Sequence, residues 1–459
     1  MKTASKPYTN PLDVDRTVAL CNLGCSKNQV DGQKILHQCQ QAGLRIVPEY
    51  SDADVIIVNT CAFIRDAQEE AINTVLSMGS CKKTGCCTLL VVAGCFSQRY
   101  RDTVTAEFPE VDAWIGVDNW PVELAKLLKS RPHESFKRIL SNPIHTQYLK
   151  IADGCSHRCS FCAIPSIRGS FRSRPADEIL SEAKWLYAQG CKECIVVSQD
   201  TTAYGRDCKS SLVALLGEIV AKTRFSWIRL MYLYPALVTD ELLEFIAAHP
   251  RVCKYFDIPL QHCADPILKS MRRAPGGAGL VRLIDRIRSI VPDAAIRTSL
   301  IVGYPGETAA QFKQLIRFVT DMRFDKLGVF PFSAEEGTTA AAMRPVVTQT
   351  VANRRAQELM EVQREISSSI SNSRIGKSVA VLIDSLPSDS QPYATGRTQW
   401  DAPEVDGTVF VEPSKTDLQI GGIYQAIITD ADEYDLHARV LPEPANGKRD
   451  TKRQRRPQA

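Results

Sequence analysis

The sequence lacks the features of a membrane or secreted protein. Its 459 residues contain no apolar run of about 18 or more residues, and the N-terminal stretch MKTASKPYTNPLDVDRT has no apolar core like that of a signal peptide. The net charge is only +4, which is too small to indicate a polyanionic partner by itself. We therefore expect a globular, cytoplasmic protein that does not bind a membrane. No internal repeat occurs beyond an alternation of strand-like and helix-like segments.

Cysteine, by contrast, is abundant, with sixteen residues. In a reducing compartment such cysteines indicate metal ligands or buried thiols rather than disulfides. The chain is also too long for one ordinary hydrophobic core, so we expect two or three domains.

Residues 14–130 have the pattern of a parallel α/β domain. Short apolar runs, TVALCNL, DVIIVN and TLLVVAG, predict strands. Helical periodicity lies between and after these runs, over residues 28–41, 64–78 and 121–129. Strands that alternate with helices predict a parallel sheet. We expect residues 1–13 to be flexible and the polar, proline-containing residues 131–145 to form a linker.

Residues 146–373 repeat a strand–helix pattern six times, which predicts a partial (β/α)6 TIM-like barrel. The strand candidates are YLKIAD, CIVVSQ, WIRLMYL, YFDIPL, IRTSLIVG and GVFPFS. Helices are predicted between them over residues 176–189, 211–222, 238–248, 279–290 and 308–321, and a long exit helix over 349–372. The reactive face of such a barrel lies at the carboxyl ends of its strands.

Residues 374–443 change to short β-like runs separated by glycine and proline turns, which predicts a small antiparallel, OB-like β-barrel. This section has five Lys or Arg residues against twelve Asp or Glu residues, a balance of −7. Residues 444–459 form a basic, low-complexity tail that we expect to be disordered.

The loop GCSHRCSFC places three cysteines, Cys155, Cys159 and Cys162, directly after the first barrel strand. Thiolate is the ligand that iron–sulfur clusters take, and three thiolates on one cube leave one iron open to a small molecule. Two alternatives are a zinc site completed by His157 or a distant cysteine, and buried thiols without metal. The spacing favours the cluster, because zinc sites usually pair two close cysteines with a second close pair.

A second set of cysteines follows three different strands of the first section. Cys25, Cys61 and Cys95 each lie just past a predicted strand. Because the carboxyl ends of parallel strands share one edge of a sheet, we expect these cysteines to converge and to hold a second cluster. The alternative is that each is a small buried apolar residue. Gly24 and Gly94 precede two of them and would let the backbone approach a bulky cluster.

Four further cysteines have no predicted role. The CKKTGCC run, with Cys81, Cys86 and Cys87, could bind zinc, but it precedes the strand TLLVVAG and should therefore lie at the opposite edge of the sheet. Cys21 lies within a strand candidate. The remaining cysteines are expected to be buried or incidental thiols: Cys39, Cys191, Cys194, Cys208, Cys253 and Cys263.

Polar residues at the ends of the barrel strands are candidates for binding a small molecule. Gln199 and Asp200 end the second strand, and Arg297 and Glu307 lie in and after the fifth. Each could equally be a surface cap or a salt-bridge partner.

The motifs resemble a known family. CSHRCSFC resembles the CxxxCxxC signature of the radical S-adenosylmethionine superfamily, and the longer string KIADGCSHRCSFCAIPSIRGSFRSRP resembles its methylthiotransferase branch. LGCSKNQVD, NTCAFI and AGC resemble the N-terminal domain of that branch, with Ser26 where proline is frequent, and the C-terminal section is similar to a TRAM domain. The resemblance implies S-adenosylmethionine as cofactor and two [4Fe–4S] clusters, held by the two sets of three cysteines. It also implies an electron donor such as flavodoxin or ferredoxin.

Methylthiotransferases act either on tRNA adenosine or on the β-carbon of an aspartate in the small-subunit ribosomal protein numbered twelve. QDTTAYGRD, PLQHCAD, FSAEEGT and WDAPEVDG resemble the protein-modifying branch. The acidic C-terminal section agrees, since it would repel RNA phosphate and attract a basic ribosomal protein. Acidic surfaces can also serve solubility alone. The alternatives are a tRNA adenosine methylthiotransferase and a non-catalytic iron–sulfur factor that binds the ribosome. We expect a monomer.

Overall fold

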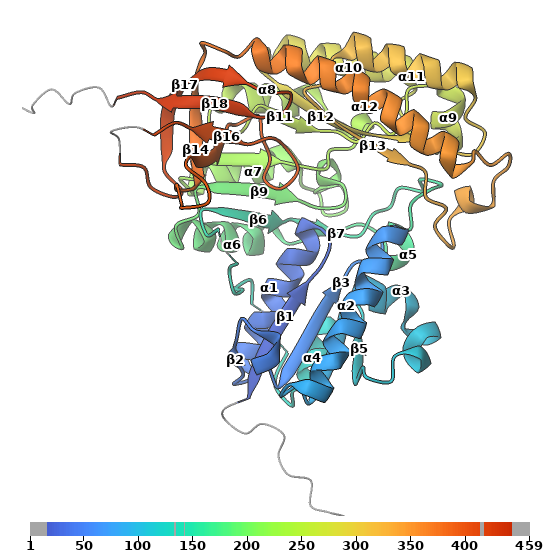
Figure 1. Ribbon diagram of the computed structural model, residues 1–459, viewed down its shortest axis with the longest axis vertical. Helices are drawn as coiled ribbons and strands as arrows, with labels where there is room; N and C mark the ends of the chain where they lie inside the picture. The colour runs from blue at the N-terminus through green and yellow to red at the C-terminus, as the bar shows by residue number, and fades with distance from the viewer. Residues whose placement is uncertain (1–15, 133–134, 142, 414–416, 443–459) are drawn as a thin grey trace, which may run out of the picture. The chain divides into compact units, whose positions relative to one another are not determined.

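A computed structural model of the protein describes residues 16–132, 135–141, 143–413 and 417–442 (Figure 1). The predicted flexible N-terminus, residues 1–13, and the predicted basic tail, residues 444–459, lie outside these ranges. The chain divides into two compact units, Met1–Ile366 and Ser367–Ala459. The N-terminal sheet and the barrel strands therefore belong to one unit.

The first unit begins with a five-stranded parallel sheet in the order β2-β1-β3-β4-β5 (Figure 1). The strands are β1 (Thr17–Asn22), β2 (Arg45–Ile46), β3 (Val55–Thr60), β4 (Leu89–Gly94) and β5 (Ala113–Ile115). The helices that follow them are α1 (Ser26–Gln41), α2 (Arg65–Thr84), α3 (Cys95–Val104) and α4 (Trp120–Leu127). The predicted parallel α/β domain is confirmed.

Helices cover both faces of this sheet, which is why its central strands are apolar throughout rather than alternating. On one face Ile57 packs in a core with Ile35 of α1 and Leu124 of α4. On the other face Ile56 packs in a separate core with Val75 of α2. All six residues of β3 are buried, so the strand is fixed from both sides.

The barrel consists of two three-stranded parallel sheets, β6-β9-β10 and β11-β12-β13, joined by a bridge between Ile228 and Val252. Its strands are β6 (Thr146–Lys150), β9 (Glu193–Val197), β10 (Trp227–Leu230), β11 (Tyr255–Asp257), β12 (Ala295–Val302) and β13 (Lys326–Pro331). Within the described residues no strand pairing joins β13 back to β6. The six-stranded partial barrel is thus confirmed.

Helices separate these strands, with two of them between the fourth and the fifth strand, and a long helix follows the last strand. They are α6 (Ala176–Ala188), α7 (Leu212–Lys222), α8 (Asp240–Ala248), α9 (Asp265–Ser270), α10 (Gly277–Ile290), α11 (Ala309–Met322) and α12 (Gln349–Asn372). Several begin at side-chain caps that the sequence encodes. Ser211 and Thr239 each accept a hydrogen bond from a backbone N–H of the first turn, and Thr308 forms a capping box with Gln311.

The second unit contains a closed five-stranded barrel in the order β14-β15-β16-β18-β17. Its strands are β14 (Ser378–Ser385), β15 (Ala394–Arg397), β16 (Val409–Val411), β17 (Ile423–Ala431) and β18 (Leu436–Val440). Four neighbouring pairs are antiparallel, as predicted, but β16 and β18 are parallel. An odd number of strands cannot alternate in direction all the way around a closed ring, so one parallel pair is unavoidable.

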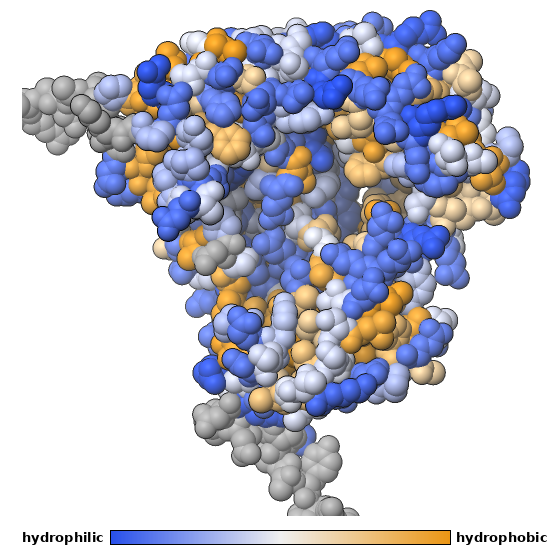
Figure 2. Space-filling model, in the orientation of Figure 1, coloured by the Kyte–Doolittle hydropathy of each residue, from blue (hydrophilic) through white to orange (hydrophobic). Residues whose placement is uncertain are grey.

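Among the described residues no helix has both the length and the apolar character needed to cross a membrane. On the face shown in Figure 2, hydrophilic residues predominate and hydrophobic residues occur in small separate groups.

Candidate active site

Three cysteines lie in a loop whose two ends are held together by a pair of short strands. After β6 the short strands β7 (Ala152–Asp153) and β8 (Arg172–Ser173) pair in antiparallel fashion, and the loop between them carries Cys155, Cys159 and Cys162. We call these three residues the loop triad. The N–H of Cys155 donates to the carbonyl oxygen of Gly169 at 3.1 Å. Gly154 has φ +75°, and a Cβ there would lie 2.2 Å from the carbonyl oxygen of Ser170, so glycine is required for this closure.

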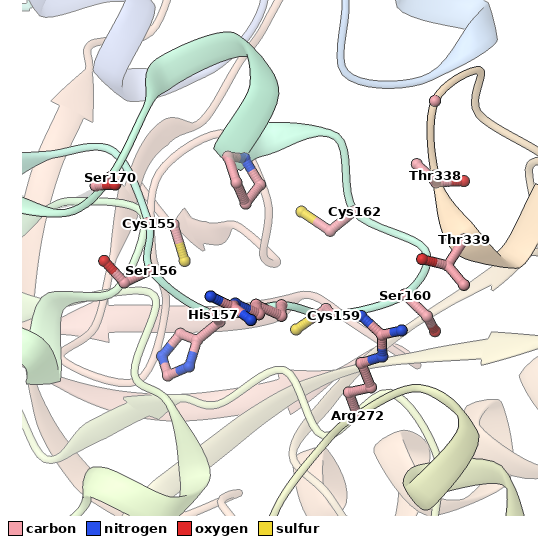
Figure 3. Close-up of a pocket in the computed structure, with 13 residues that line it drawn as sticks. Cys155, Ser156, His157, Cys159, Ser160, Cys162, Ser170, Arg272, Thr338 and Thr339 are labelled. Carbon is pink, nitrogen blue, oxygen red and sulfur yellow. The ribbon is translucent and has the colours of Figure 1, made fainter.

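The loop triad surrounds a cavity of about 380 Å³. In Figure 3 the sulfur atoms of Cys155 and Cys162 point into the space that the loop encloses. The volume falls within the range of small-molecule pockets, about 300–1,000 Å³. The other lining residues come from the same loop, from the turn after α9 and from the segment after β13: Ser156, His157, Arg158, Ser160, Pro165, Ser170, Arg272, Gly337, Thr338 and Thr339.

The thiols of the loop triad lie close enough to influence one another. Burial, with a smaller contribution from neighbouring cysteines, raises the pKa of Cys155 to about 11 and the pKa of Cys162 to about 12. Thiols with raised pKa values, such as Cys155 and Cys162, need added positive charge before they can act as thiolates. Iron supplies that charge, and metal ligands must be deprotonated to bind. The donor set therefore fits an iron–sulfur cluster.

A stack of side chains lies beside the loop triad. The Nε2 atom of His157 is 2.6 Å from Oδ2 of Asp200, and the His157 ring stacks on Tyr234 with ring centres 3.7 Å apart. The guanidinium of Arg273 lies 4.4 Å from the centre of the same tyrosine ring, and its Nη1 is 3.8 Å from Sγ of Cys159. One nitrogen of His157 is thus paired with a carboxylate, and the residue lines the cavity.

The second set of cysteines converges at one edge of the N-terminal sheet because β1, β3 and β4 are neighbours. Cys25 caps the start of α1, Cys61 follows β3 directly, and Cys95 is the first residue of α3. We call these three the sheet triad. Each of Cys61 and Cys95 experiences the charge of Cys25. The close packing depends on Gly24, where φ is +87° and a Cβ would lie only 2.7 Å from Cβ of Cys61.

Positive charge already surrounds part of the sheet triad. Burial raises the pKa of Cys61 to about 11 and raises the pKa of Cys95 as well. Burial also acts to raise the pKa of Cys25, but the nearby charges of Lys27 and Arg168 outweigh it, and the pKa of Cys25 is lowered. The positive charge beside Cys25 therefore favours the thiolate form of this member of the triad.

One short segment joins the two triads. It begins at Cys162, continues as the helix α5 (Ile164–Arg168), and ends where Nε of Arg168 donates to Sγ of Cys95 at 3.4 Å. Ile167 of this helix is buried in the same small core as Cys95. The two triads are consequently adjacent within the first unit.

A buried ion-pair network stabilises this junction. Asp31 of α1 is 2.7 Å from Nζ of Lys150 and 2.7 Å from Nη1 of Arg168. Asp153 is 2.6 Å from Lys150 and 3.4 Å from Arg168. Burial acts to raise the pKa of both carboxyl groups, but the two cations hold each pKa below its usual range. This network was not predicted, although charged residues in the strand YLKIAD and on an otherwise buried helix face were a signal for it.

The four residues predicted to contact the small molecule do not line the cavity. Each has an internal partner instead. Gln199 donates to Asp153 at 3.1 Å, Asp200 holds His157, Arg297 is 2.8 Å from Asp257, and Glu307 is buried and 2.9 Å from Arg355. Their roles as S-adenosylmethionine ligands stay predictions. Ser170, Thr338 and Thr339 do line the cavity and were not predicted to, although Ser170 and Thr338 lie within the strings KIADGCSHRCSFCAIPSIRGSFRSRP and FSAEEGT.

The other cysteines lie elsewhere. Cys86 and Cys87 precede β4 and so lie at the edge opposite to Cys95, with Cys86 exposed. The thiols expected to be buried are buried, with the exception of Cys208: Cys39, Cys191, Cys194, Cys253 and Cys263. In the part of the chain that the structure describes, no three His, Cys, Asp or Glu side chains are close enough to hold a single metal ion. A [4Fe–4S] cluster does not need three ligands around one metal ion, because each thiolate binds a different iron.

Comparison with known proteins defines the class. Residues 149–319 match the Radical SAM superfamily, residues 375–441 match the TRAM domain, and residues 17–116 match a family described as uncharacterized protein family UPF0004. Among solved structures, the chain resembles the radical S-adenosylmethionine methyltransferase TsrM from Kitasatospora setae, with a TM-score of 0.52 and 13% identity over 69% of this chain and 75% of that chain. That likeness shows the fold alone. The chain is a radical S-adenosylmethionine enzyme, and such enzymes use an iron–sulfur cluster and S-adenosylmethionine.

Relatives over nearly the full length define the family. The chain is 40% identical to the ribosomal protein uS12 methylthiotransferase RimO of Geotalea uraniireducens over 94% of this chain and 99% of that protein. It is 43% identical to the protein of the same name from Syntrophus aciditrophicus, with the same coverage of 94% and 99%. The chain belongs to the RimO family of ribosomal protein uS12 methylthiotransferases. The tRNA-modifying and non-catalytic alternatives find no support in these relatives.

Proposed function

We propose that this protein adds a methylthio group to the β-carbon of an aspartate in ribosomal protein uS12. The observation that carries this proposal is the pair of adjacent cysteine triads, each with three thiols and joined by α5. A β-methylene C–H bond is neither acidic nor activated, so an acid–base side chain has little effect on it. Two adjacent cofactor sites suit the reaction, because the cofactors supply chemistry that side chains cannot.

In this proposal the loop triad holds the cluster that binds S-adenosylmethionine, and the sheet triad holds a second [4Fe–4S] cluster. When bound, these groups supply a carbon radical and a methylated sulfur. In this proposal the chain's own residues bind the two clusters and orient S-adenosylmethionine. Three thiolates leave one corner of each cluster open. Ser170 and Thr339 in the cavity wall offer hydroxyl donors to the polar end of S-adenosylmethionine, whereas the Thr338 hydroxyl donates to the carbonyl oxygen of Glu335 at 2.7 Å and offers only an acceptor.

The partner in this proposal is a basic ribosomal protein. The section 374–443 has a charge balance of −7. Complementary charge of this kind steers and orients a basic protein, whereas phosphate would be repelled. We further propose that the electron comes from a small donor such as flavodoxin or ferredoxin and that the enzyme acts in the cytoplasm as a monomer.

Comparative mass spectrometry tests the proposed function. In a strain that lacks this protein, uS12 should lose the mass of one methylthio group, while tRNA should keep all of its methylthio-adenosine. Complementation with the wild-type chain should restore the uS12 mass, and complementation with the Cys162→Ala variant should not. Loss of methylthio-adenosine from tRNA with unchanged uS12 would refute the proposal.

A further inference from the structure

The guanidinium of Arg168 is buried, with 3% of the side chain exposed, and its donors are directed to four different side chains. Nη1 lies 2.7 Å from Asp31 and 3.4 Å from Asp153, and Nη2 lies 3.1 Å from Oδ1 of Asn28. The remaining polar nitrogen, Nε, lies 3.4 Å from Sγ of Cys95. One arginine thus connects the sheet triad to α1 and to the strand that precedes the loop triad.

The direction of the Nε–H bond is fixed by the other contacts. A guanidinium is planar, and its five N–H groups form a rigid fork. Because Asp31 and Asn28 hold the two terminal nitrogens, Nε–H has little freedom to turn away from Cys95. Both of these partners lie on α1, the helix that begins at Cys25 of the same triad. Arg168 is therefore oriented by the helix that begins at Cys25, and it donates to Cys95, the member of the triad on α3.

Asp31 and Asp153 do not neutralise Arg168 by themselves, because Lys150 pairs with the same two carboxylates. The network contains two carboxylates and two cations, so its balance is neutral before the thiolates of the triad are counted. Buried charge of this kind acts strongly on its neighbours, since little water screens it. Cys95 is itself only 7% exposed.

We propose that Arg168 is a positioning residue that raises the reduction potential of the cluster on the sheet triad, through its hydrogen bond and its charge at Cys95; this rests on the proposed function. One-electron reduction adds negative charge to a cluster. A cation and an N–H donor at a ligand sulfur stabilise the reduced form more than the oxidised form, and hydrogen bonds to sulfur are one of the factors that set such potentials.

The loop triad offers a contrast within the same chain. Arg273 approaches Cys159, but at 3.8 Å, and its side chain is partly exposed. It stacks on Tyr234 and its Nη2 donates to the carbonyl oxygen of Pro259, so neither of these partners is a carboxylate. Solvent screens such a charge, so arginine should affect the potential of the loop-triad cluster less.

The test uses a full-length chain that carries only the sheet-triad cluster, with Cys155, Cys159 and Cys162 all replaced by alanine. In this parent, Arg168→Lys keeps a charge but loses the fixed fork, and Arg168→Met loses both. Redox titration followed by electron paramagnetic resonance should give a more negative midpoint potential for Arg168→Lys than for the parent, and a still more negative one for Arg168→Met. Arg172→Lys is the matched control, because Arg172 is exposed and pairs with Asp118.

Several outcomes would overturn the inference. They are unchanged potentials in both Arg168 variants, or a shift as large in Arg172→Lys. If both Arg168 variants lost their iron, Arg168 would hold the cluster rather than tune it, and the inference would also be wrong. A parent without any iron would instead contradict the proposed second cluster itself, and the inference with it.

Discussion

The loop triad and the sheet triad differ in how the chain assembles them. The loop triad comes from eight consecutive residues and lines a cavity with serine and threonine hydroxyls. The members of the sheet triad follow three different strands, whose ends are neighbours only because the sheet is parallel. Cys95 is buried in a small core with Ile167 of α5. The first arrangement leaves room for a small molecule, whereas the second buries Cys95 and places the fixed charge of Arg168 beside it. This difference suggests that the loop triad serves a cofactor that enters and leaves and the sheet triad serves a resident one.

The largest expected effect comes from removing each triad. Replacing all three cysteines of either triad by alanine should lower the iron content from about eight to about four atoms per chain, because each cubane contains four irons. The loop-triad variant should form no 5′-deoxyadenosine in anaerobic assays with dithionite. The sheet-triad variant should still form it but should not methylthiolate uS12.

The control for this experiment is the triple replacement of Cys81, Cys86 and Cys87 by alanine, which should keep about eight irons. Iron near eight in either triad variant would contradict the ligand assignment. Equal loss of 5′-deoxyadenosine in both triad variants would remove the functional distinction between the two sites.

A smaller effect should follow from crowding the sheet triad alone. Gly24→Ala would bring a Cβ within 2.7 Å of Cβ of Cys61, at a residue with φ +87°. Gly43 has φ +93° and no atom within 4 Å of the added Cβ, so Gly43→Ala shares the backbone strain without the clash. The strain costs roughly 1–2 kcal/mol in either case. Only Gly24→Ala should also lose iron, measured beside the unfolding free energy.

If Gly43→Ala lost as much iron as Gly24→Ala, general destabilisation rather than contact with Cys61 would be the cause. If Gly24→Ala kept all of its iron, the close packing of the sheet triad would not be needed for its cluster.

The smallest effect on iron content is expected for the segment after β13, which contacts α2 and α3. After β13, Glu335 accepts hydrogen bonds from the backbone N–H of Arg65 at 3.0 Å and from Gln68 at 2.8 Å, and it pairs with Arg99 at 3.3 Å. Glu335→Ala leaves the buried Arg99 without its carboxylate, which should lower the free energy of unfolding by about 3–5 kcal/mol. Equilibrium denaturation by urea measures this change.

Glu335→Ala should also weaken S-adenosylmethionine binding, because the same segment carries Thr338 and Thr339 in the cavity wall. It should leave the iron content unchanged, since it touches neither triad. The exposed neighbour Glu336 is the control, and Glu336→Ala should change stability by no more than about 0.5 kcal/mol. A loss of iron in Glu335→Ala would show that the segment supports the clusters as well as the cavity.

Much of the fold followed from sequence patterns. The long helix predicted over residues 349–372 is α12, with the same bounds, because its apolar periodicity runs over many turns. The short helix α5 was missed, because five residues that include a proline are too few to show a helical period. The parallel pair β16–β18 was also missed, since strand direction within a closed barrel depends on connections that no local pattern records.

The candidate site was predicted unevenly for a similar reason. The two triads were recognisable because thiolate chemistry needs cysteine and because strand ends of a parallel sheet share an edge. The cavity wall was not, since Thr338 and Thr339 are separated from Cys159 by most of the barrel. Polar residues at strand ends looked like ligands, but the structure gives Arg297 and Glu307 internal ion pairs.

The sequence by itself determined the two sets of cysteines, the main alternation of strands and helices, and the acidic balance of residues 374–443, because spacing, periodicity and charge are local properties of the chain. Only the tertiary structure decided which charges meet the thiols. Arg168 reaches Asp31 and Asn28 across 137 and 140 residues of sequence, and Glu335 reaches Gln68 across 267. Contacts over such separations depend on how the sheet and the barrel pack together, and packing is a property of the folded chain as a whole.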